Sequence, residues 1–358
     1  MSKTRGVVIV AKLTHACNLA CKYCYMQTSR SSGRMSDDIL QAIIRKAQAY
    51  YSDIEYTWHG GEPMLVKNDV FKQIIDLQHT YSHPKQSITN NIQTNGTLLS
   101  AERVEFLNKL GFGIGISYDG VSSAHDSVRL FIDGESSSKR VIKGIENVIK
   151  VCGSVGVCIV LTKANIGMPK EMYWNLKELG VGSVNFIPFM NYPRNDDLSV
   201  DSLELFTFWK NFMEVYLSDE QSFSIISPLF QYMGGLLGNF ETHCVCDSNC
   251  LGGVLSVDMH GNIYLCDIVD PGAKLGNILE LERIAQVWQS DRFQRFIEAN
   301  RLFLESSCRK CKWFSVCGAG CRANAFAERG NFSSIDPYCE ARKAIIEWLY
   351  EKLRVYSV

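Results

Sequence analysis

The sequence lacks an excess of charge of either sign, because its 358 residues carry 37 Lys and Arg against 38 Asp and Glu, a formal net charge of −1. Without a basic block there is no electrostatic footprint for a nucleic-acid backbone, so we expect no nucleic-acid partner. It also lacks any apolar run near the ~18 residues that span a bilayer. Residues 7–11 are too short for a secretory signal core of roughly 7–15 residues. We therefore expect no membrane partner and a cytoplasmic location.

Cysteine, by contrast, is abundant, with 14 in the chain. Reducing compartments rarely keep structural disulfides, and cysteine-dense cytoplasmic chains usually bind metal. Nine of the 14 lie between Cys244 and Cys339. The distribution predicts a metal-binding region in the C-terminal third of the chain.

Short apolar segments alternate with helical patterns through the first half of the chain. The expected strands are residues 7–13, 54–59, 87–94, 113–118, 155–161 and 184–188, and the expected helices are residues 36–49, 69–80, 100–110, 138–151 and 169–179. Six successive strand-helix units predict an α/β fold, a partial (β/α)6 barrel of the TIM type. The active site of such a barrel lies at the C-terminal ends of its strands.

The alternation stops after residue 188, which suggests three units. Residues 1–200 form the barrel, 201–240 a helical connector, and 241–358 a cysteine-rich domain with a C-terminal helix at 338–353. Residues 223–240 look like a mixed connector. Residues 254–265 predict a hairpin, and most of the remaining segment up to Cys339 looks turn-rich, so we expect metal to hold this domain together.

Three cysteines, Cys17, Cys21 and Cys24, follow the first strand as a C-x3-C-x2-C run. Three thiolates on one loop can hold three irons of a [4Fe–4S] cube and leave the fourth iron without a protein ligand. The alternative is a zinc site, for which His15 is the only nearby fourth ligand. The position at the end of the first strand favours the cluster.

This spacing, with the aromatic Tyr23 before the last cysteine, resembles the radical S-adenosylmethionine (radical SAM) superfamily. Further matches follow the next strands: Trp-His-Gly-Gly-Glu-Pro at 58–63, Gln-Thr-Asn-Gly at 93–96 and Gly-Ile-Ser-Tyr-Asp-Gly at 115–120. The resemblance implies SAM as a cofactor, cleaved to a 5′-deoxyadenosyl radical that takes hydrogen from a substrate. The motifs and the resemblance together assign cofactor contacts to Tyr23, Gly60, Gly61, Glu62, Asn95, Ser117, Arg129 and Val184. The alternatives are a surface ion pair for Arg129 and strand core for Val184.

The C-terminal cysteines resemble the SPASM extension of radical SAM enzymes, which binds two auxiliary [4Fe–4S] clusters. Its seven motif cysteines are Cys250, Cys266, Cys308, Cys311, Cys317, Cys321 and Cys339. Eight thiolates are needed, and Cys244 or Cys246 can supply the last. A zinc ribbon is the alternative.

Among SPASM proteins the chain resembles anaerobic sulfatase-maturating enzymes and related peptide-modifying enzymes. That resemblance implies one cluster on Cys244, Cys250, Cys266 and Cys321 and another on Cys308, Cys311, Cys317 and Cys339. The chain would then hold three [4Fe–4S] clusters in all.

Several single residues bear on the reaction. The resemblance implies that Asp267 takes a proton from the substrate as a general base, with a turn-capping aspartate as the alternative. His59 stands where a sulfatase maturase is expected to have glutamine, which favours another peptide. Cys246 is open to three roles: a reserve ligand, a hydrogen donor or a surface thiol. Cys152 and Cys158 have apolar neighbours and are expected to be buried core thiols.

The leading hypothesis is an enzyme that oxidises or cross-links a side chain within a peptide or protein, in peptide maturation or in formylglycine formation in a sulfatase. The alternative is a radical SAM dehydrogenase or epimerase of a sugar or aminoglycoside, with Cys246 as hydrogen donor. A non-enzymatic iron–sulfur or zinc protein is disfavoured by the open cysteine triplet.

The resemblance also implies partners. A flavodoxin- or ferredoxin-type protein would supply electrons. Only a short polar start, residues 2–5, precedes the first strand, so we expect no peptide-recognition domain before the barrel. A leader peptide would dock on the barrel or on a separate leader-binding protein.

Overall fold

The computed structural model describes residues 6–26, 31–191, 195–220, 223, 225–239, 244–267 and 271–356. The polar start at residues 2–5, on which the expectation about a preceding domain rests, lies outside these residues. Among the helices described, none combines the length and the apolar character needed to cross a membrane.

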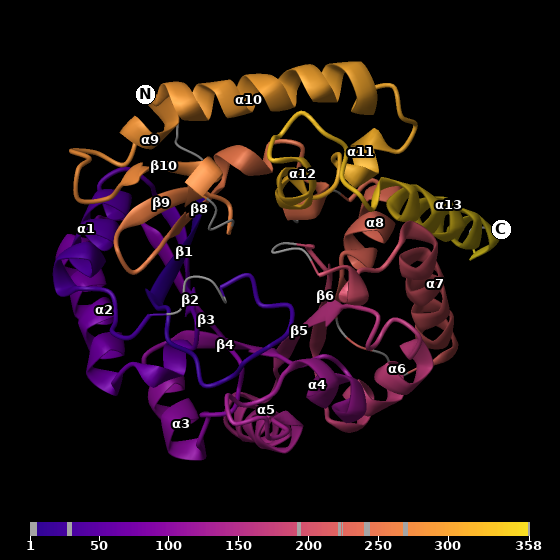
Figure 1. Cartoon of the computed structure of the whole chain (residues 1–358), viewed down its shortest axis with the longest axis horizontal. Coiled ribbons are helices and arrows are strands. Elements are labelled where there is room, and N and C mark those ends of the chain that lie inside the picture. Colours follow the sequence, from indigo (N-terminus) through magenta and orange to yellow (C-terminus); the bar gives the residue numbers. More distant parts are fainter. Residues whose placement is uncertain are drawn as a thin grey trace.

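A single sheet of ten strands organises the described chain (Figure 1). Its strands are β1 (Val7–Thr14), β2 (Asp53–Gly60), β3 (Ser87–Thr94), β4 (Phe112–Ser117), β5 (Gly156–Leu161), β6 (Ser183–Pro188), β7 (Ile225–Ser227), β8 (Val254–Val257), β9 (Asn262–Leu265) and β10 (Lys274–Asn277). The order is β10-β9-β8-β1-β2-β3-β4-β5-β6-β7. From β8 to β7 neighbouring strands are parallel, whereas β8, β9 and β10 pair antiparallel.

Helices pack on the outer face of the strands, as Figure 1 shows for α1, α2, α3, α5, α6 and α7. The α-helices are α1 (Asp37–Gln48), α2 (Asn68–Tyr81), α3 (Ala101–Lys109), α4 (Ser122–Val128), α5 (Ser138–Cys152), α6 (Pro169–Glu178), α7 (Ser202–Ser218), α8 (Leu229–Leu236), α9 (Gln286–Gln289), α10 (Asp291–Phe303), α11 (Phe314–Cys317), α12 (Arg322–Arg329) and α13 (Cys339–Tyr356). Their starts follow local chemistry. Ser36, for example, caps α1 by accepting a hydrogen bond from the Ile39 amide, which satisfies one unpaired N–H of the first turn.

Side chains alternate between the hydrophobic core and the inside of the barrel. On β1, Ile9, Ala11 and Leu13 belong to the core packed under the helices, so Lys12 between them points to the inner side. A cavity of about 300 Å³ inside the barrel is lined by Glu55, Thr57, Asn91, Ile92, Gln93, Ile114 and Gly115. The inner side of the barrel is therefore largely polar, as a binding site requires.

The predicted α/β barrel is confirmed, and all six of its expected strands are present. The mixed connector expected at 223–240 contains a short strand, β7, and a short helix, α8. One expectation about a later segment is wrong, because the supposed turn-rich segment contains the 13-residue helix α10. Ser290 caps α10, and Phe293 and Phe303 are buried on one side of it; this helical pattern is present in the sequence.

The hairpin predicted at 254–265 is present as β8 and β9, but it does not stand apart from the barrel. Strand β8 pairs in parallel with β1, with Val8 opposite Val254 and Ala11 opposite Val257. This pairing covers the open edge of β1, which would otherwise expose unpaired N–H and C=O groups. The cysteine-rich region and the barrel therefore share one sheet. The division of the chain into three units stays a prediction.

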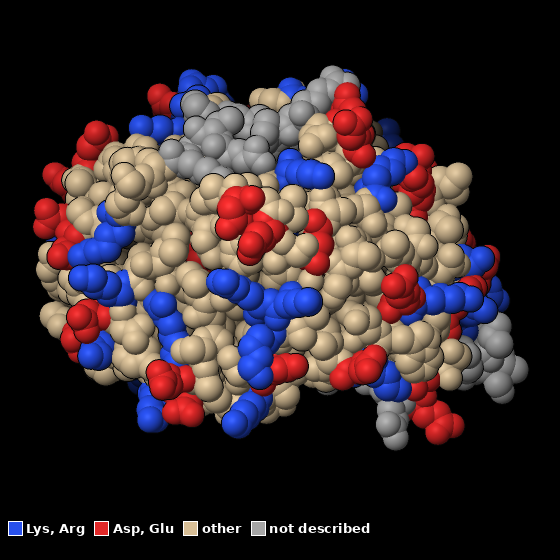
Figure 2. Space-filling view, turned by 60° about the horizontal axis from the view of Figure 1, so that its bottom comes forward, with Lys and Arg blue, Asp and Glu red and all other residues tan. Residues whose placement is uncertain are grey.

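Charged side chains of both signs are interspersed over the face displayed in Figure 2. Most ion pairs described are exposed and join residues three or four positions apart, such as Arg34 and Asp37. Such pairs contribute little to stability.

One ion pair of the C-terminal region is instead fully buried. The side chains of Asp336 and Arg342 are each 1% exposed, and Arg342 Nη2 lies 3.0 Å from Asp336 Oδ2. Arg342 also donates to the Tyr232 hydroxyl of α8 at 2.5 Å, and Asp336 accepts from the Cys321 amide at 2.6 Å. The pair therefore joins α13 and α8 to the loop that carries Cys321.

We predict that Asp336→Asn lowers the free energy of unfolding by about 3 kcal/mol, because Arg342 stays buried without its counterion. The matched control is Asp37→Asn, which removes the exposed partner of Arg34 and should change stability little. Urea unfolding followed by circular dichroism measures both. Equal losses for the two variants would contradict the role given to the buried pair.

Candidate active site

The loop after β1 brings the first three thiols together. Burial raises the pKa of Cys21 to about 12, and the neighbouring thiols of Cys24 and Cys17 add to this rise while Arg129 opposes it. A second segment holds the loop by main-chain bonds, since the amides of residues 20 and 22 donate to the carbonyls of residues 130 and 128 at 2.7 and 2.9 Å. The predicted triplet is thus one compact site at the C-terminal end of β1.

Two glycines at the end of β2 pack against the start of this loop. A Cβ added to Gly60, whose φ is +127°, would lie 2.2 Å from the Thr14 oxygen, and one added to Gly61 would lie 2.2 Å from the Ala16 oxygen. The Gly61 amide donates to the Thr14 carbonyl at 2.8 Å. The close packing of the backbone therefore explains why glycine is required at both positions. The contact with the cofactor that the sequence predicts for these glycines stays a prediction.

Glu62 connects the ends of β2 and β3. Its carboxylate is fully buried and accepts hydrogen bonds from the Thr94 hydroxyl at 2.6 Å and the Asn95 amide at 2.7 Å. Burial raises the pKa of Glu62 and these hydrogen bonds only partly offset it. The Asn95 side-chain amide lies 3.9 Å from Cys17 Sγ. Glu62 therefore positions Asn95 beside the first thiol, with its own oxygens engaged by the protein.

Tyr23, Asp119 and Arg129 form a buried group on the other side of the loop. The Tyr23 hydroxyl donates to Asp119 Oδ2 at 2.6 Å, and Arg129 Nε donates to the same oxygen at 3.0 Å. The Arg129 guanidinium lies 5.0 Å from the centre of the Tyr23 ring. Arg129 is 8% exposed. Its ion pair with Asp119 is therefore buried, and the alternative of a surface ion pair is wrong. Sequence reasoning missed Asp119, although a carboxylate directly after a strand end was a usable signal.

A polar row crosses the inside of the barrel. Ser117 accepts a hydrogen bond from Gln93 Nε2 at 3.0 Å, and the Cys158 thiol donates to Gln93 Oε1 at 3.6 Å. Cys158 therefore lies in this polar row rather than in the apolar core expected for it. The expectation for Cys152 is also wrong, because this last residue of α5 is exposed.

Val184 lies apart from the polar row. It is 2% exposed and belongs to the hydrophobic core. On β6 it is in register with Val157 and Ile226 of the neighbouring strands. Its side chain is therefore part of the strand core, which was the alternative to a cofactor contact. Only the main chain of Val184 is left for the predicted contact.

Asp267 sits at the barrel mouth with three partners from the first two strands and the cysteine loop. It forms an ion pair with Lys12 and accepts a hydrogen bond from the Tyr25 hydroxyl at 2.7 Å. Lys12 also donates to the Tyr25 hydroxyl at 2.9 Å. His59 is the register partner of Lys12 on β2, and its charge interaction with Asp267 places it nearby.

Burial tends to raise the pKa of Asp267, but Lys12, His59 and the Tyr25 hydrogen bond outweigh it, so the pKa lies below its usual value. The side chain of Asp267 is 36% exposed, whereas that of Lys12 is 0% exposed. The carboxylate is thus ionised at neutral pH and open to a substrate. Lys12 and Tyr25 were missed, and the signal for Lys12 was a charge inside an otherwise apolar strand.

Neighbouring thiols link members of each of the two quartets that the resemblance implies. After burial, the thiols of Cys321, Cys244 and Cys250 contribute most to raising the pKa of Cys266. In the second group, burial raises the pKa of Cys308, and the thiols of Cys339 and Cys311 add to this rise. Burial also raises the pKa of Cys339, and Cys317 adds to that rise. All 14 cysteines are described and none forms a disulfide. Ligation of clusters by these quartets stays a prediction.

Cys246 lies between the quartets. Burial raises its pKa to about 12, with Cys317 and Cys244 as thiol neighbours and Arg342 opposing the rise. Its carbonyl packs so closely on Gly318 that a Cβ there would lie 2.1 Å from the oxygen. The structure does not bring Cys246 to Asp267. Within the described ranges, no three His, Cys, Asp or Glu side chains are arranged to hold a single metal ion.

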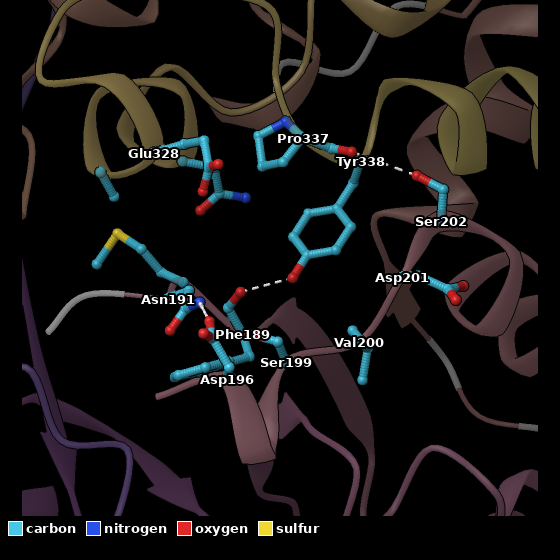
Figure 3. Close-up of a pocket in the computed structure, with 13 residues that line it drawn as sticks. Phe189, Asn191, Asp196, Ser199, Val200, Asp201, Ser202, Glu328, Pro337 and Tyr338 are labelled. Carbon is cyan, nitrogen blue, oxygen red and sulfur yellow. Dashed lines mark hydrogen bonds between the residues drawn. The ribbon is translucent and has the colours of Figure 1, made fainter. Parts of the chain in front are cut away.

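A cavity of about 700 Å³ opens between the barrel and the C-terminal region (Figure 3). Tyr338 reaches across it and donates to the Phe189 carbonyl at 2.7 Å. Glu328 and Asn191 lie on the opposite side of Tyr338 from Asp201. The Phe189 ring lies 6.4 Å from that of Tyr23 in the cysteine loop. The cavity is therefore next to the cysteine triplet and large enough for a short peptide segment.

Comparisons with known proteins agree with this geometry. Residues 12–174 match the Radical SAM superfamily, and residues 246–312 match SPASM, an iron–sulfur cluster-binding domain. A cysteine-type anaerobic sulfatase-maturating enzyme of Clostridium perfringens is 24% identical over 97% of this chain and 96% of its own length. A serine-type enzyme of Bacteroides thetaiotaomicron is 27% identical over 89% of this chain and 83% of its own.

Solved structures share the fold. Native anSMEcpe with bound AdoMet has a TM-score of 0.87 and 22% identity and covers 98% of this chain and 99% of its own. Streptococcus suis SuiB bound to precursor peptide SuiA has a TM-score of 0.67 and 17% identity, over 92% of this chain and 74% of its own. The chain therefore combines a radical SAM domain, which uses a [4Fe–4S] cluster and S-adenosylmethionine, with a SPASM domain for further iron–sulfur clusters, and it is homologous to anaerobic sulfatase-maturating enzymes.

Proposed function

We propose that this radical SAM protein is an oxidoreductase that oxidises or cross-links a side chain in a peptide or protein. The observation that carries the proposal is the ionised, accessible Asp267, which accepts a hydrogen bond from Tyr25, the residue that follows Cys24. Homology to sulfatase-maturating enzymes over nearly the whole chain supports it. So does the occurrence of peptide complexes among structures of the same fold, such as anSMEcpe with the Kp18Cys peptide. Peptide maturation and formylglycine formation are the two forms this activity could take.

The donor set fits the cofactors. Cys17, Cys21 and Cys24 would hold the first cluster, and the two quartets would hold two auxiliary clusters, which gives three [4Fe–4S] clusters in total. When bound, S-adenosylmethionine and the first cluster supply a 5′-deoxyadenosyl radical that removes a hydrogen atom from the substrate. The proposed contacts to S-adenosylmethionine remain Tyr23, Gly60, Gly61, Glu62, Asn95, Ser117, Arg129 and Val184.

The geometry distinguishes roles among these contacts. Glu62 acts by holding the Asn95 amide, and Val184 acts through its main chain. Asp119 fixes both Tyr23 and Arg129 through one carboxylate oxygen. A rigid cationic guanidinium at this place suits a carboxylate such as that of the methionine end of the cofactor.

Asp267 would accept the proton that the substrate side chain releases as it is oxidised. Its Oδ1 pairs with Lys12 and its Oδ2 accepts from Tyr25, so its orientation is fixed before a substrate arrives. A net oxidation also releases a second electron, for which two auxiliary clusters are suited. A flavodoxin- or ferredoxin-type electron donor and a separate leader-binding protein remain proposed partners.

The alternative, an epimerase or dehydrogenase of a sugar or aminoglycoside with Cys246 as hydrogen donor, is not favoured. Cys246 has Cys317, Cys244 and Arg342 as its neighbours. A hydrogen donor must reach the substrate carbon, and that carbon would lie near Asp267.

The cluster assignment predicts about 12 irons per chain after anaerobic reconstitution. Replacing Cys17, Cys21 and Cys24 together by Ala should leave about 8 irons and abolish deoxyadenosine formation, because only the first cluster is lost. Iron analysis and chromatography of the nucleoside products measure this. Four irons in the unaltered protein, or zinc in the quartets, would refute the assignment.

The base role predicts a selective defect in Asp267→Asn. The amide cannot take a proton, so product should fall by roughly 10²-fold or more, while S-adenosylmethionine cleavage and iron content are retained. Liquid chromatography with mass spectrometry of both products gives the ratio. Near-normal product yield would make Asp267 a turn residue only.

Isotope labelling tests the reaction type on candidate peptides encoded beside the gene. An oxidative peptide enzyme removes two hydrogen atoms from the substrate side chain, so its first product is lighter by two hydrogen atoms, with one deoxyadenosine per turnover and little dependence on Cys246; a thioaldehyde formed from cysteine then exchanges its sulfur for the oxygen of water. A redox-neutral epimerase working in deuterium oxide would instead place solvent deuterium on the product carbon, and Cys246→Ala would stop it. Solvent deuterium in a free sugar product would overturn the proposal.

A further inference from the structure

Lys12 is a fully buried lysine on the inner side of the barrel, with 0% exposure. Strand β1 is otherwise apolar except for its terminal Thr14. Burying an ammonium group is costly unless it is paired and hydrogen-bonded. A lysine at this place needs a counterion, and the only carboxylate recorded with it in the described chain is that of Asp267.

The contacts of Lys12 are all directed at the proposed base and its neighbour. Its Nζ donates to Asp267 Oδ1 and to the Tyr25 hydroxyl, and it lies 5.0 Å from the centre of the Tyr25 ring. Tyr25 in turn donates to the second oxygen of Asp267. The three side chains close a ring of contacts that fixes the carboxylate plane, and Asp267 alone of the ion pair is open, with 36% exposure.

We propose that Lys12 is a positioning and specificity residue: it orients the Asp267 carboxylate toward the substrate and cancels its charge. This inference rests on the proposed function and names the kind of side chain that the site accepts. An isolated carboxylate would attract a cation, such as the side chain of Lys or Arg. A carboxylate already paired with an ammonium offers only its remaining lone pairs, so it selects an uncharged hydrogen-bond donor, namely a thiol, a hydroxyl or an amide.

The remaining charged groups near Asp267 do not change the expected preference for an uncharged substrate side chain. His59 and the adjacent Cys266 are further titratable groups beside Asp267, and Arg129 has its charge engaged by Asp119. A substrate cation would therefore meet two paired cations, Lys12 with Asp267 and Arg129 with Asp119, and no unpaired carboxylate of the described chain to attract it.

A thermal unfolding cycle tests the pairing without any substrate. Lys12→Met, Asp267→Asn and the double variant are reconstituted with clusters and melted anaerobically. Asp267→Asn leaves a buried ammonium unpaired and should lower the melting temperature by several degrees, whereas the double variant should regain most of that loss. Additive losses would overturn the claim that Lys12 acts through Asp267.

Lys46 provides a matched control. It is also a buried lysine, at 7% exposure, but its Nζ donates to backbone carbonyls, including that of Ile278 at 2.6 Å. Lys46→Met should lower the melting temperature, and its effect should add to that of Asp267→Asn. It lies in α1, outside the site.

A selection experiment tests specificity. A displayed library of random peptides is selected on the reconstituted protein with S-adenosylmethionine, for the unaltered chain, Lys12→Met and Lys46→Met. The unaltered chain and Lys46→Met should enrich Cys, Ser, Thr, Asn or Gln at one shared position. Lys12→Met should raise the frequency of Lys and Arg there by about tenfold or more, because the carboxylate is no longer paired.

The outcomes are distinguishable. The same residue preference on the unaltered chain and on Lys12→Met would overturn the specificity role. If no peptide is enriched on any of the three proteins, the proposed peptide substrate fails instead, and the unfolding cycle alone decides whether Lys12 holds Asp267.

Discussion

The chemistry of this chain depends on how closely the end of β2 packs against the loop that follows β1. There is room only for hydrogen on the Cα atoms of Gly60 and Gly61, because the carbonyls of Thr14 and Ala16 occupy the rest. The next residue, Glu62, is buried and binds the end of β3. Main-chain packing between β1 and β2 and the Glu62 carboxylate bound to the end of β3 therefore hold three strand ends beside the cysteine triplet, and the side chains at the mouth are arranged on this frame.

The second determinant is the pairing of β8 with β1. Strand β9 returns antiparallel to β8 and ends at Leu265, and the Asp267 side chain two residues later reaches Lys12 on the inner side of β1 and Tyr25. Asp267 is 255 residues away from Lys12 in sequence, yet the two form an ion pair. One hairpin thereby supplies a ligand of a predicted auxiliary cluster and the proposed base at adjacent positions.

Much of the fold could be predicted from local signals. The six barrel strands and the helices between them follow from apolar periodicity and from caps such as Ser36. Strand β7 and helix α8 were not predicted individually. They have three and eight residues, which is too short for a strand or helix periodicity of apolar residues to be recognised. Cys152 was misplaced because its neighbours are apolar, although it ends α5 and faces outward.

The site was predictable only in part, because contacts between distant segments decide the roles. The thiol groupings followed from spacing and resemblance. Asp119 and Tyr25 acquire their roles through partners about 96 and 242 residues away. A sequence shows that a polar residue occurs at a strand end, but the partner that orients it appears only when the strands are assembled.

The shared sheet also has a consequence for how the molecule opens. Since β8 and β1 exchange main-chain hydrogen bonds along Val8 to Ala11, the cysteine-rich region cannot detach as a separate body without exposing an edge in the middle of the barrel sheet. Local opening is limited to segments with few such bonds. Loosening of the β8–β9 hairpin would therefore disturb the first strand of the barrel, which carries Lys12 and leads into the cysteine triplet.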